Sequence, residues 1–449
     1  MPLPIERFVL DTRYGDLPKE VRAVMRRSLL DNLGVAAIGR QSRISQIVRG
    51  FAAEHQPAAP GGRGARLMFD GRRVATAAAA MAGAFSLDSI DAHDGHSGVK
   101  GHAGSAVLPA VLAMIDDLRG QGRAFTGPDM LAAIAVAYEV GYRSGLCLHG
   151  TVDDYHTSGA WTAVGVAAAG ARLLGLDGEG VRQAVGIAEY HGPRSQMMRC
   201  IDHPSMVRDG VGWGAPAGVD AAHLAERGFT GAPAITTEGA AAEPWWHDLG
   251  ERWEILATHY KPYPVCRWAH PAIDAAGELM RDHGLASADV AGIRIQTFHN
   301  ATRLAGQEPR NIDELSYSIA FPVATMVARG RIGPDELDEA VLDDAEILRL
   351  SRATELVETE HYTRISVGKR WADVTLVLAD GRQLQSEPRT PRGDPEDPLS
   401  DDELSAKFHL LADPVLGSVR TREIEARIPG LEEAKSNLAE FLDLVLEPV

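Results

Sequence analysis

Apolar residues recur every three or four positions over most of the first 270 residues, which is the spacing of one face of an α-helix. The stretch 17–38 is one example, and similar runs cover 74–87, 105–118, 128–146, 158–174, 178–188 and 214–226. Alanine and glycine are abundant inside these runs, so the helix axes can approach one another closely. This first region is therefore predicted to be a dense all-α bundle.

The pattern changes after residue 270. One more helix, over 271–283, precedes 291–299, where apolar and polar residues alternate as in a half-buried strand. Further strands are predicted over 363–367 and 372–378, and Asp380-Gly381 then predicts a hairpin turn with a return strand over 382–386. The stretch 387–399 is rich in Pro, Arg, Asp and Gly and is expected to be an exposed connection. Helical spacing returns over 401–411 and 431–446.

The domain organisation follows from these two patterns. A chain of 449 residues is too long for one ordinary core, so two domains are expected. We predict a mainly α fold in which residues 1–268 plus 395–449 form a large all-α helical domain. Residues 269–394 are expected to form a smaller α+β lid domain, inserted before the C-terminal helices.

Composition excludes several classes of protein. The formal net charge of -17 argues against a nucleic-acid partner, which requires a basic face, and any anionic ligand must be held by local clusters of cations. The Ala-rich run 74–87 is shorter than the roughly 20 residues of a membrane span, and no signal peptide is evident. The three cysteines are widely spaced and form no CxxC pair. We expect a cytoplasmic protein that binds neither membrane nor nucleic acid.

The densest group of polar residues lies over 88–105, between two apolar helices, and it includes Asp91, His93, Asp94, His96 and His102. Imidazoles and carboxylates can bind zinc, manganese or iron, or they can carry protons in a metal-free active site. A polar loop without a role is a further possibility. No HExxH or similar His pair is present, which favours metal-free catalysis.

Two further polar segments precede helices. His156 and Thr157 stand at a predicted helix N-terminus, where backbone N–H groups favour an anion, although they could act only as a cap. Arg208 precedes a glycine-rich run and could hold a carboxylate with two hydrogen bonds, or it could form an ordinary surface ion pair.

A segment stiffened by prolines, 261–270, lies at the junction between the two predicted domains, where ligand pockets are common. Its prolines would point Lys261, Arg267 and His270 in fixed directions. The alternatives are a stiff linker whose charges face water, or a nucleophilic role for Cys266; free cysteine is more often a buried apolar residue.

Taken together, these segments resemble the MmgE/PrpD family, whose members include dehydratases, decarboxylases and epimerases of small polycarboxylates. The resemblance rests on Leu-Asp-Ser-Ile-Asp-Ala-His at 87–93, His-Ala-Gly-Ser-Ala-Val-Leu-Pro at 102–109, Tyr-His-Thr-Ser at 155–158, Ala-Arg-Leu-Leu-Gly-Leu-Asp at 171–177 and the segment 261–270. It implies a helical domain, a lid, a site between them and a homodimer. Where many members carry a lysine followed by His-x-Gly, this chain has Arg208-Asp209-Gly210, and its loop 91–102 is richer in histidine.

The resemblance also implies the roles of individual residues. The expected catalytic residues are Asp91, His102, His156, Lys261 and Tyr317, the last being similar to the lid tyrosine of the family. The expected substrate-binding residues are His93, Arg208, Arg267, His270 and Thr157.

The predicted function is a metal-independent lyase of the 2-methylcitrate dehydratase type, without cofactor, that acts on a small di- or tricarboxylate. It would remove a proton next to a carboxylate, with His102 and His156 as base and acid and Asp91 orienting one imidazole. Epimerisation and decarboxylation are alternatives within the family. A metal-dependent hydrolase built on the loop 91–102 and a non-catalytic helical scaffold are alternatives of other classes.

Overall fold

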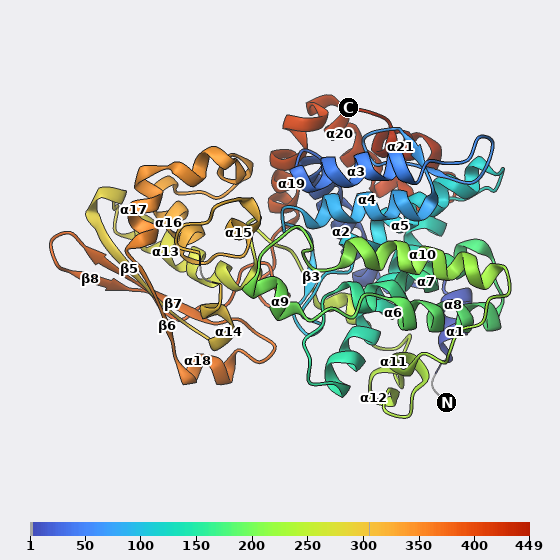
Figure 1. Cartoon of the computed structure of the whole chain (residues 1–449), viewed down its shortest axis with the longest axis horizontal. Coiled ribbons are helices and arrows are strands. Elements are labelled where there is room, and N and C mark those ends of the chain that lie inside the picture. Colours follow the sequence, from blue (N-terminus) through green and yellow to red (C-terminus); the bar gives the residue numbers. More distant parts are fainter. Residues whose placement is uncertain (1–2, 305) are drawn as a thin grey trace.

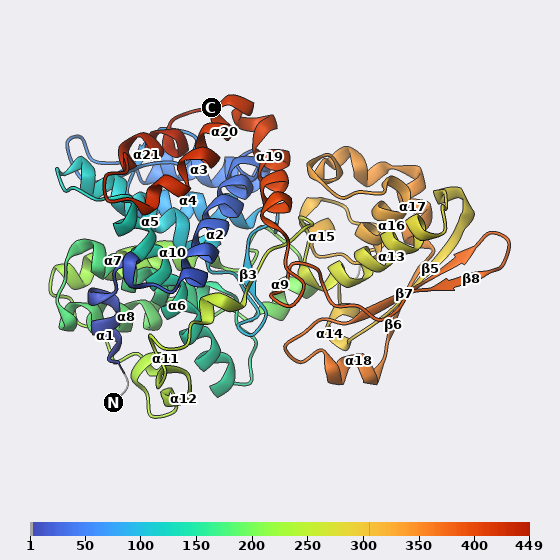
Figure 2. The ribbon, with the colours of Figure 1, turned by 180° about the vertical axis from the view of Figure 1, so that it is seen from behind.

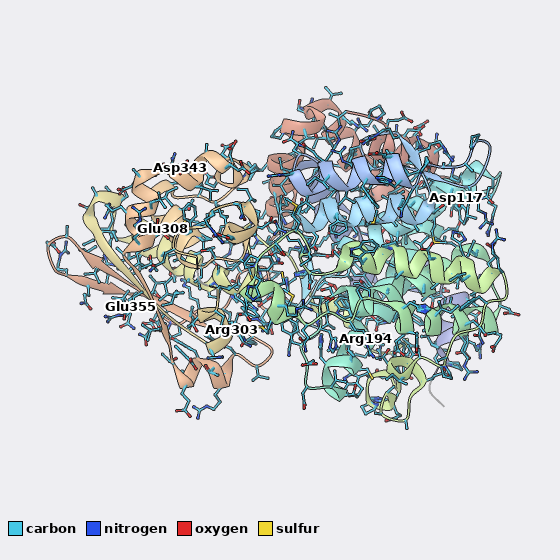
Figure 3. All side chains as sticks on the ribbon, in the orientation of Figure 1. Asp117, Arg194, Arg303, Glu308, Asp343 and Glu355 are labelled. Atoms are coloured by element: carbon cyan, nitrogen blue, oxygen red, sulfur yellow. The ribbon has the colours of Figure 1, made fainter. Side chains whose placement is uncertain are left out.

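The computed structural model describes residues 3–304 and 306–449, which form two lobes that lie side by side (Figures 1 and 2). The larger helical lobe holds the helices of residues 5–246 and 401–446, and the smaller mixed lobe holds the helices and strands of residues 270–385. Side chains of both lobes fill the junction between them (Figure 3). Arg303, labelled there, pairs with Asp202 across this junction. The mainly α fold class is confirmed.

The helical lobe contains every helix that the apolar spacing predicts before residue 270. Its long helices are α2 (Lys19–Gly39), α3 (Arg43–His55), α4 (Thr76–Asp88), α5 (Gly104–Gly120), α6 (Gly127–Thr151), α7 (Gly159–Leu174), α8 (Gly178–His191) and α10 (Val211–Glu226). Short elements connect them, namely α1 (Ile5–Asp11), β1 (Ala65–Arg66), β2 (Arg73–Val74), β3 (Gly95–His96), α9 (Met197–Asp202), α11 (Ile235–Glu238), α12 (Glu243–Trp246) and β4 (Thr258–His259).

Glycines bring the central helices together, as predicted. A Cβ added to Gly165 of α7 would overlap the Ala137 carbonyl of α6, and one added to Gly218 of α10 would lie 2.6 Å from the Ala163 carbonyl oxygen of α7. Helix α6 begins with a capping box between Thr126 and Asp129. By length and composition α6 could cross a membrane, but 94% of its apolar window is buried inside the lobe, as is typical of a core helix.

The chain returns to the helical lobe at its C-terminal end. There α19 (Asp401–Leu416), α20 (Ser418–Arg427) and α21 (Leu438–Leu446) contribute to the large core. The Lys407 ammonium of α19 donates to Asp31 of α2 at 2.6 Å and to the Ala92 carbonyl oxygen at 2.7 Å. The predicted return is confirmed, whereas the boundaries at 268 and 395 stay predictions.

The mixed lobe is built on a four-stranded sheet of order β6-β5-β7-β8, in which β5 and β6 are parallel and the other pairs antiparallel. The strands are β5 (Val290–Thr297), β6 (Thr354–Glu358), β7 (Ala372–Leu378) and β8 (Gln383–Gln385). The helices are α13 (His270–Asp282), α14 (His299–Thr302), α15 (Ile312–Ser316), α16 (Ala320–Arg329), α17 (Ala345–Arg352) and α18 (Glu360–Ile365). Helices α13, α16 and α17 cover one face of the sheet (Figure 1).

One strand prediction needs correction, and one strand was not predicted. The stretch 363–367 is wrong as a strand, because Thr359 caps helix α18 by accepting a hydrogen bond from the Tyr362 backbone N–H at 3.2 Å. The buried Tyr362 then anchors this helix by donating to Asp373 of β7. Strand β6 was not predicted from the sequence. The hairpin at Asp380-Gly381 is confirmed, since β7 pairs antiparallel with β8 there.

Candidate active site

A cavity of about 530 Å³, including its open mouth, lies where the two lobes meet. The loop 91–102 and the segment 258–268 supply most of its wall from the helical side, and Tyr317 and Arg370 face it from the mixed lobe. Strands β3 and β4 pair antiparallel, with Gly95 opposite His259, so the loop and the proline-stiffened segment are held against each other. The predicted site between the helical and α+β parts therefore has a physical counterpart.

The centre of the site is a buried ion pair between Lys261 and Asp91. The Lys261 side chain is fully buried, and its ammonium donates to the Asp91 carboxylate and, at 2.9 Å, to the Asp91 carbonyl oxygen. Asp91 adopts φ 51°, a left-handed conformation that is uncommon for a residue other than glycine. Such conformations persist where surrounding contacts enforce them, and they concentrate at functional sites.

His102 is oriented as a proton acceptor. Its Nδ1 lies 2.8 Å from the Asp94 carbonyl oxygen, which can only accept, so Nδ1 carries the proton and Nε2 keeps a lone pair. Its backbone N–H donates to Ser158 Oγ at 3.0 Å. Burial, and secondly the charge of Lys261, hold the pKa of His102 well below its usual value. The imidazole is therefore neutral at pH 7 and able to take up a proton.

His93 lies behind His102. The two rings meet edge to face with centroids 4.2 Å apart, and His93 Nε2 lies 3.2 Å from Asp88 but 3.9 Å from Asp91. The structure does not support the expectation that Asp91 orients His102 or His156, because the Nδ1 atoms of these histidines face the carbonyl oxygens of Asp94 and Asp154. Asp91 is instead held by Lys261, and Asp88 is the carboxylate nearer to His93. His93 does not line the cavity.

Asp91, His93 and His102 offer possible metal-ligand atoms that lie within 4.8 Å of one another. This is the cluster on which a metal-dependent hydrolase would be built, without His96, whose Nε2 faces Glu254 at 3.5 Å. The Lys261 ammonium, however, already neutralises Asp91. A divalent cation bound to that carboxylate would face a fixed positive charge in a buried setting, where charge repulsion is strong.

Arg267, His259 and Tyr317 also line the cavity. Arg267 donates to the buried Asp394 at 2.7 Å, while its Nε and Nη1 have no partner among the described residues. His259 lies 3.5 Å from Asp394, and burial followed by the charge of Arg267 holds its pKa well below its usual value. Burial raises the pKa of Tyr317 well above its usual value, so this phenol keeps its proton at pH 7.

Besides His93, four predicted site residues do not line the cavity, namely His156, Thr157, Arg208 and His270. The half-buried His156 turns Nδ1 toward the Asp154 carbonyl oxygen at 2.9 Å, and Thr157 is buried beside it. His270 Nε2 lies 3.0 Å from the Val265 carbonyl oxygen. These placements do not support direct contact with a substrate in this cavity.

Arg208 makes contacts that favour a structural role over the substrate binding predicted for it. Its Nη2 donates to the Ser89 carbonyl oxygen at 2.6 Å and pairs with Asp313 of α15 at 2.7 Å, so it links the two lobes. Its guanidinium lies 5.7 Å from the centre of the Tyr317 ring. Arg208 therefore connects the two lobes beside the cavity and does not line it.

Lys100, Tyr155, His259 and Arg370 line the cavity although the sequence assigned them no role, and Asp394 binds Arg267. Lys100 and Tyr155 lie within segments that had been singled out and His259 lies next to one, and the pairing of β3 with β4 brings His259 into the wall. Asp394 lies in the stretch predicted to be exposed, but it is buried because it binds Arg267. Arg370 had no local signal, since a lone arginine before a strand is common on surfaces.

Known proteins resemble this chain over nearly its whole length. The MmgE/PrpD N-terminal domain matches residues 4–243, and the MmgE/PrpD C-terminal domain matches residues 263–430. Cis-aconitate decarboxylase of Aspergillus terreus is 25% identical, over 97% of this chain and 93% of that protein. A cis-aconitate decarboxylase-like protein of Aspergillus oryzae is 23% identical, over 98% and 95%. Human cis-aconitate decarboxylase is 23% identical, over 74% of this chain and 72% of its own length.

The two domain matches follow each other in order and leave only short segments uncovered, so this chain belongs to the MmgE/PrpD family.

Proposed function

We propose that this protein is a metal-independent lyase that acts on a small di- or tricarboxylate by removing a proton next to a carboxylate. The observation that carries the proposal is the orientation of His102, whose unprotonated Nε2 is left free beside the Lys261–Asp91 pair in the cavity. A base that is neutral at pH 7 and fixed by a hydrogen bond on its other nitrogen meets the requirements for proton abstraction.

Loss of that proton places negative charge on carbon and on the neighbouring carboxylate. Lys261 and Arg267 supply positive charge from buried positions, where electrostatic stabilisation of a transition state is stronger than in water. Arg267 still has two guanidinium nitrogens without partners among the described residues, so it can bind an anion while remaining bound to Asp394.

Dehydration requires a group that donates a proton to the leaving hydroxyl. Tyr317 lines the cavity and keeps its proton at pH 7, whereas His156 does not line it. We therefore propose Tyr317 as the donor, with the reaction of the dehydratase type. The small polycarboxylate partner, the cytoplasmic location and the homodimer stay predictions.

Decarboxylation is a second candidate, because the curated relatives that cover most of this chain are named cis-aconitate decarboxylases. In that reaction a carbon–carbon bond breaks, CO₂ leaves, and a proton is added to the carbon that retains the electron pair. The same cationic wall would stabilise this charge. Epimerisation would instead return the proton to the opposite face of the carbon.

The test is proton NMR in D₂O with metal-stripped protein and a panel of citrate-like, aconitate-like and aspartate-derived acids, including cis-aconitate. The proposal expects deuterium exchange or turnover without metal, and the product identifies the reaction. His102→Ala should lower the rate by at least ~10²-fold, whereas the exposed His55→Ala serves as a matched control with a normal rate.

Two outcomes would contradict this proposal. Activity that appears only when metal is restored would favour the hydrolase built on Asp91, His93 and His102. A near-normal rate in His102→Ala would remove His102 as the base.

A further inference from the structure

Arg370 is a buried cation without an acidic partner. It precedes β7 in the mixed lobe and is 9% exposed. The only hydrogen bond that its guanidinium makes among the described residues runs from Nη1 to the adjacent Lys369 carbonyl oxygen at 2.8 Å. No described carboxylate lies within 4.0 Å of it, unlike Arg267 and Lys261, which pair with Asp394 and Asp91. Because a buried unpaired charge is costly, a group of this kind calls for an anion.

A second cation shares the same corner of the cavity. Lys100 comes from the loop of the helical lobe, and its ammonium lies 5.2 Å from the centre of the Tyr155 ring. The Tyr155 hydroxyl donates to the Lys100 carbonyl oxygen at 2.7 Å, which holds the loop where Lys100 adopts φ 55°. All three residues line the cavity. Although Lys100 is exposed, its partial burial and, secondly, the charge of Arg370 lower the pKa of its ammonium, which places the two cations near each other.

We propose that Arg370 and Lys100 form a subsite for a substrate carboxylate remote from the carbon that His102 deprotonates. The inference rests on the proposed function and adds to it the residues that determine specificity. The guanidinium can bind a carboxylate with two parallel hydrogen bonds, and the ammonium adds a point charge from the opposite lobe. A remote carboxylate in this corner would connect the two lobes through the substrate.

The subsite makes the protein selective for tricarboxylates. Lys261 and Arg267 face the part of the cavity near His102 and can hold the carboxylates next to the reacting carbon. Arg370 and Lys100 then remain for a third. A dicarboxylate that lacks this third group would leave the two cations without an anion, and it would bind more weakly.

The experiment compares two matched acids by isothermal titration calorimetry on the full chain. Propane-1,2,3-tricarboxylate has the remote carboxylate, and propane-1,2-dicarboxylate lacks it. Wild-type protein should bind the tricarboxylate more tightly. Arg370→Gln should weaken tricarboxylate binding by roughly 10- to 100-fold, the range for a lost charge-assisted pair, and change dicarboxylate binding by less than about threefold. The control is Arg382→Gln on the β7–β8 hairpin, where Arg382 is exposed and paired with Asp380.

The outcomes separate this inference from the proposed function. If wild-type protein binds neither acid, both fail. If wild-type protein binds both acids equally, or if Arg370→Gln weakens both equally or neither, only the subsite is wrong. Should Arg370→Gln not fold, Arg370→Lys keeps the charge but loses the two-pronged geometry. It should bind the tricarboxylate roughly tenfold more weakly, and an unchanged affinity would overturn the assignment.

Discussion

Replacing Lys261 by methionine should lower the free energy of unfolding by about 3–5 kcal/mol, because it leaves the Asp91 carboxylate buried without its cation. The magnitude follows from burial: Lys261 is 0% and Asp91 5% exposed, so water cannot take the place of the lost ammonium. An exposed ion pair would contribute at most about 1 kcal/mol. The variant also loses the hydrogen bond from the ammonium to the Asp91 carbonyl oxygen.

A double-mutant cycle tests this explanation. Asp91→Asn alone leaves a buried ammonium without its carboxylate, whereas Asp91→Asn combined with Lys261→Met removes both charges. The double variant should therefore be more stable than the sum of the single effects predicts, by about 2–3 kcal/mol. Its activity should not recover, since the cation near the substrate is still missing. Urea denaturation followed by tryptophan fluorescence and circular dichroism measures stability, with the exposed Lys435→Met as control.

The reasoning would be refuted in either of two ways. If Lys261→Met unfolds at the same urea concentration as Lys435→Met, the pair contributes no more than a surface contact. Alternatively, the effects of the two single substitutions could simply add. In that case Lys261 and Asp91 would each stabilise the loop independently, and the ion pair would not be the cause.

Three further predictions concern the surroundings of this pair. Burial holds the pKa of His270 well below its usual value, so below about pH 6.5 the unfolded chain binds a proton that the folded chain does not. As the pH falls below 6.5, this residue alone should lower the free energy of unfolding by up to about 1.4 kcal/mol per pH unit. His270→Asn should therefore flatten the pH dependence of the urea midpoint between pH 6.5 and 5. Lys407→Met should lower the free energy of unfolding by about 3 kcal/mol in the same assay, because it leaves the buried Asp31 unpaired. The control Lys435→Met should leave this free energy unchanged. A Cβ on Gly95 would lie 2.7 Å from His102 Nδ1, so Gly95→Ala should displace the imidazole and lower kcat by roughly 10²-fold in the NMR assay; a normal kcat would contradict this.

Local spacing predicted the helical lobe well because its helices are long and apolar, and central ones such as α4 and α7 are buried on nearly all sides. The strand content of the mixed lobe was harder to predict. Strand β6 is only five residues long and carries two glutamates, so its alternation is weak, and its pairing partner β5 lies more than fifty residues earlier in the chain. The threonine cap of α18 outweighed the β-branched residues that suggested a strand there.

The site was predictable where a segment is dense in polar residues, as in the loop that holds Asp91 and His102. It was not predictable where the fold supplies a single residue from a distance. Arg370 reaches the cavity only through the sheet of the mixed lobe, and Asp394 reaches Arg267 only through the connection that follows the sheet. Arg208 shows the reverse case, since its sequence position suggested a ligand contact but its hydrogen bonds connect the lobes.

The contact between Lys407 and the Ala92 carbonyl oxygen has a consequence for synthesis of the chain. The loop 91–102 is among the first segments to leave the ribosome, yet one of its anchors is translated more than three hundred residues later. Until α19 emerges, Asp31 has no cation and the loop lacks this tether. A nascent chain that stalls after the mixed lobe would therefore carry the residues that line the cavity without the helix that holds the loop in place, and we expect it to be inactive.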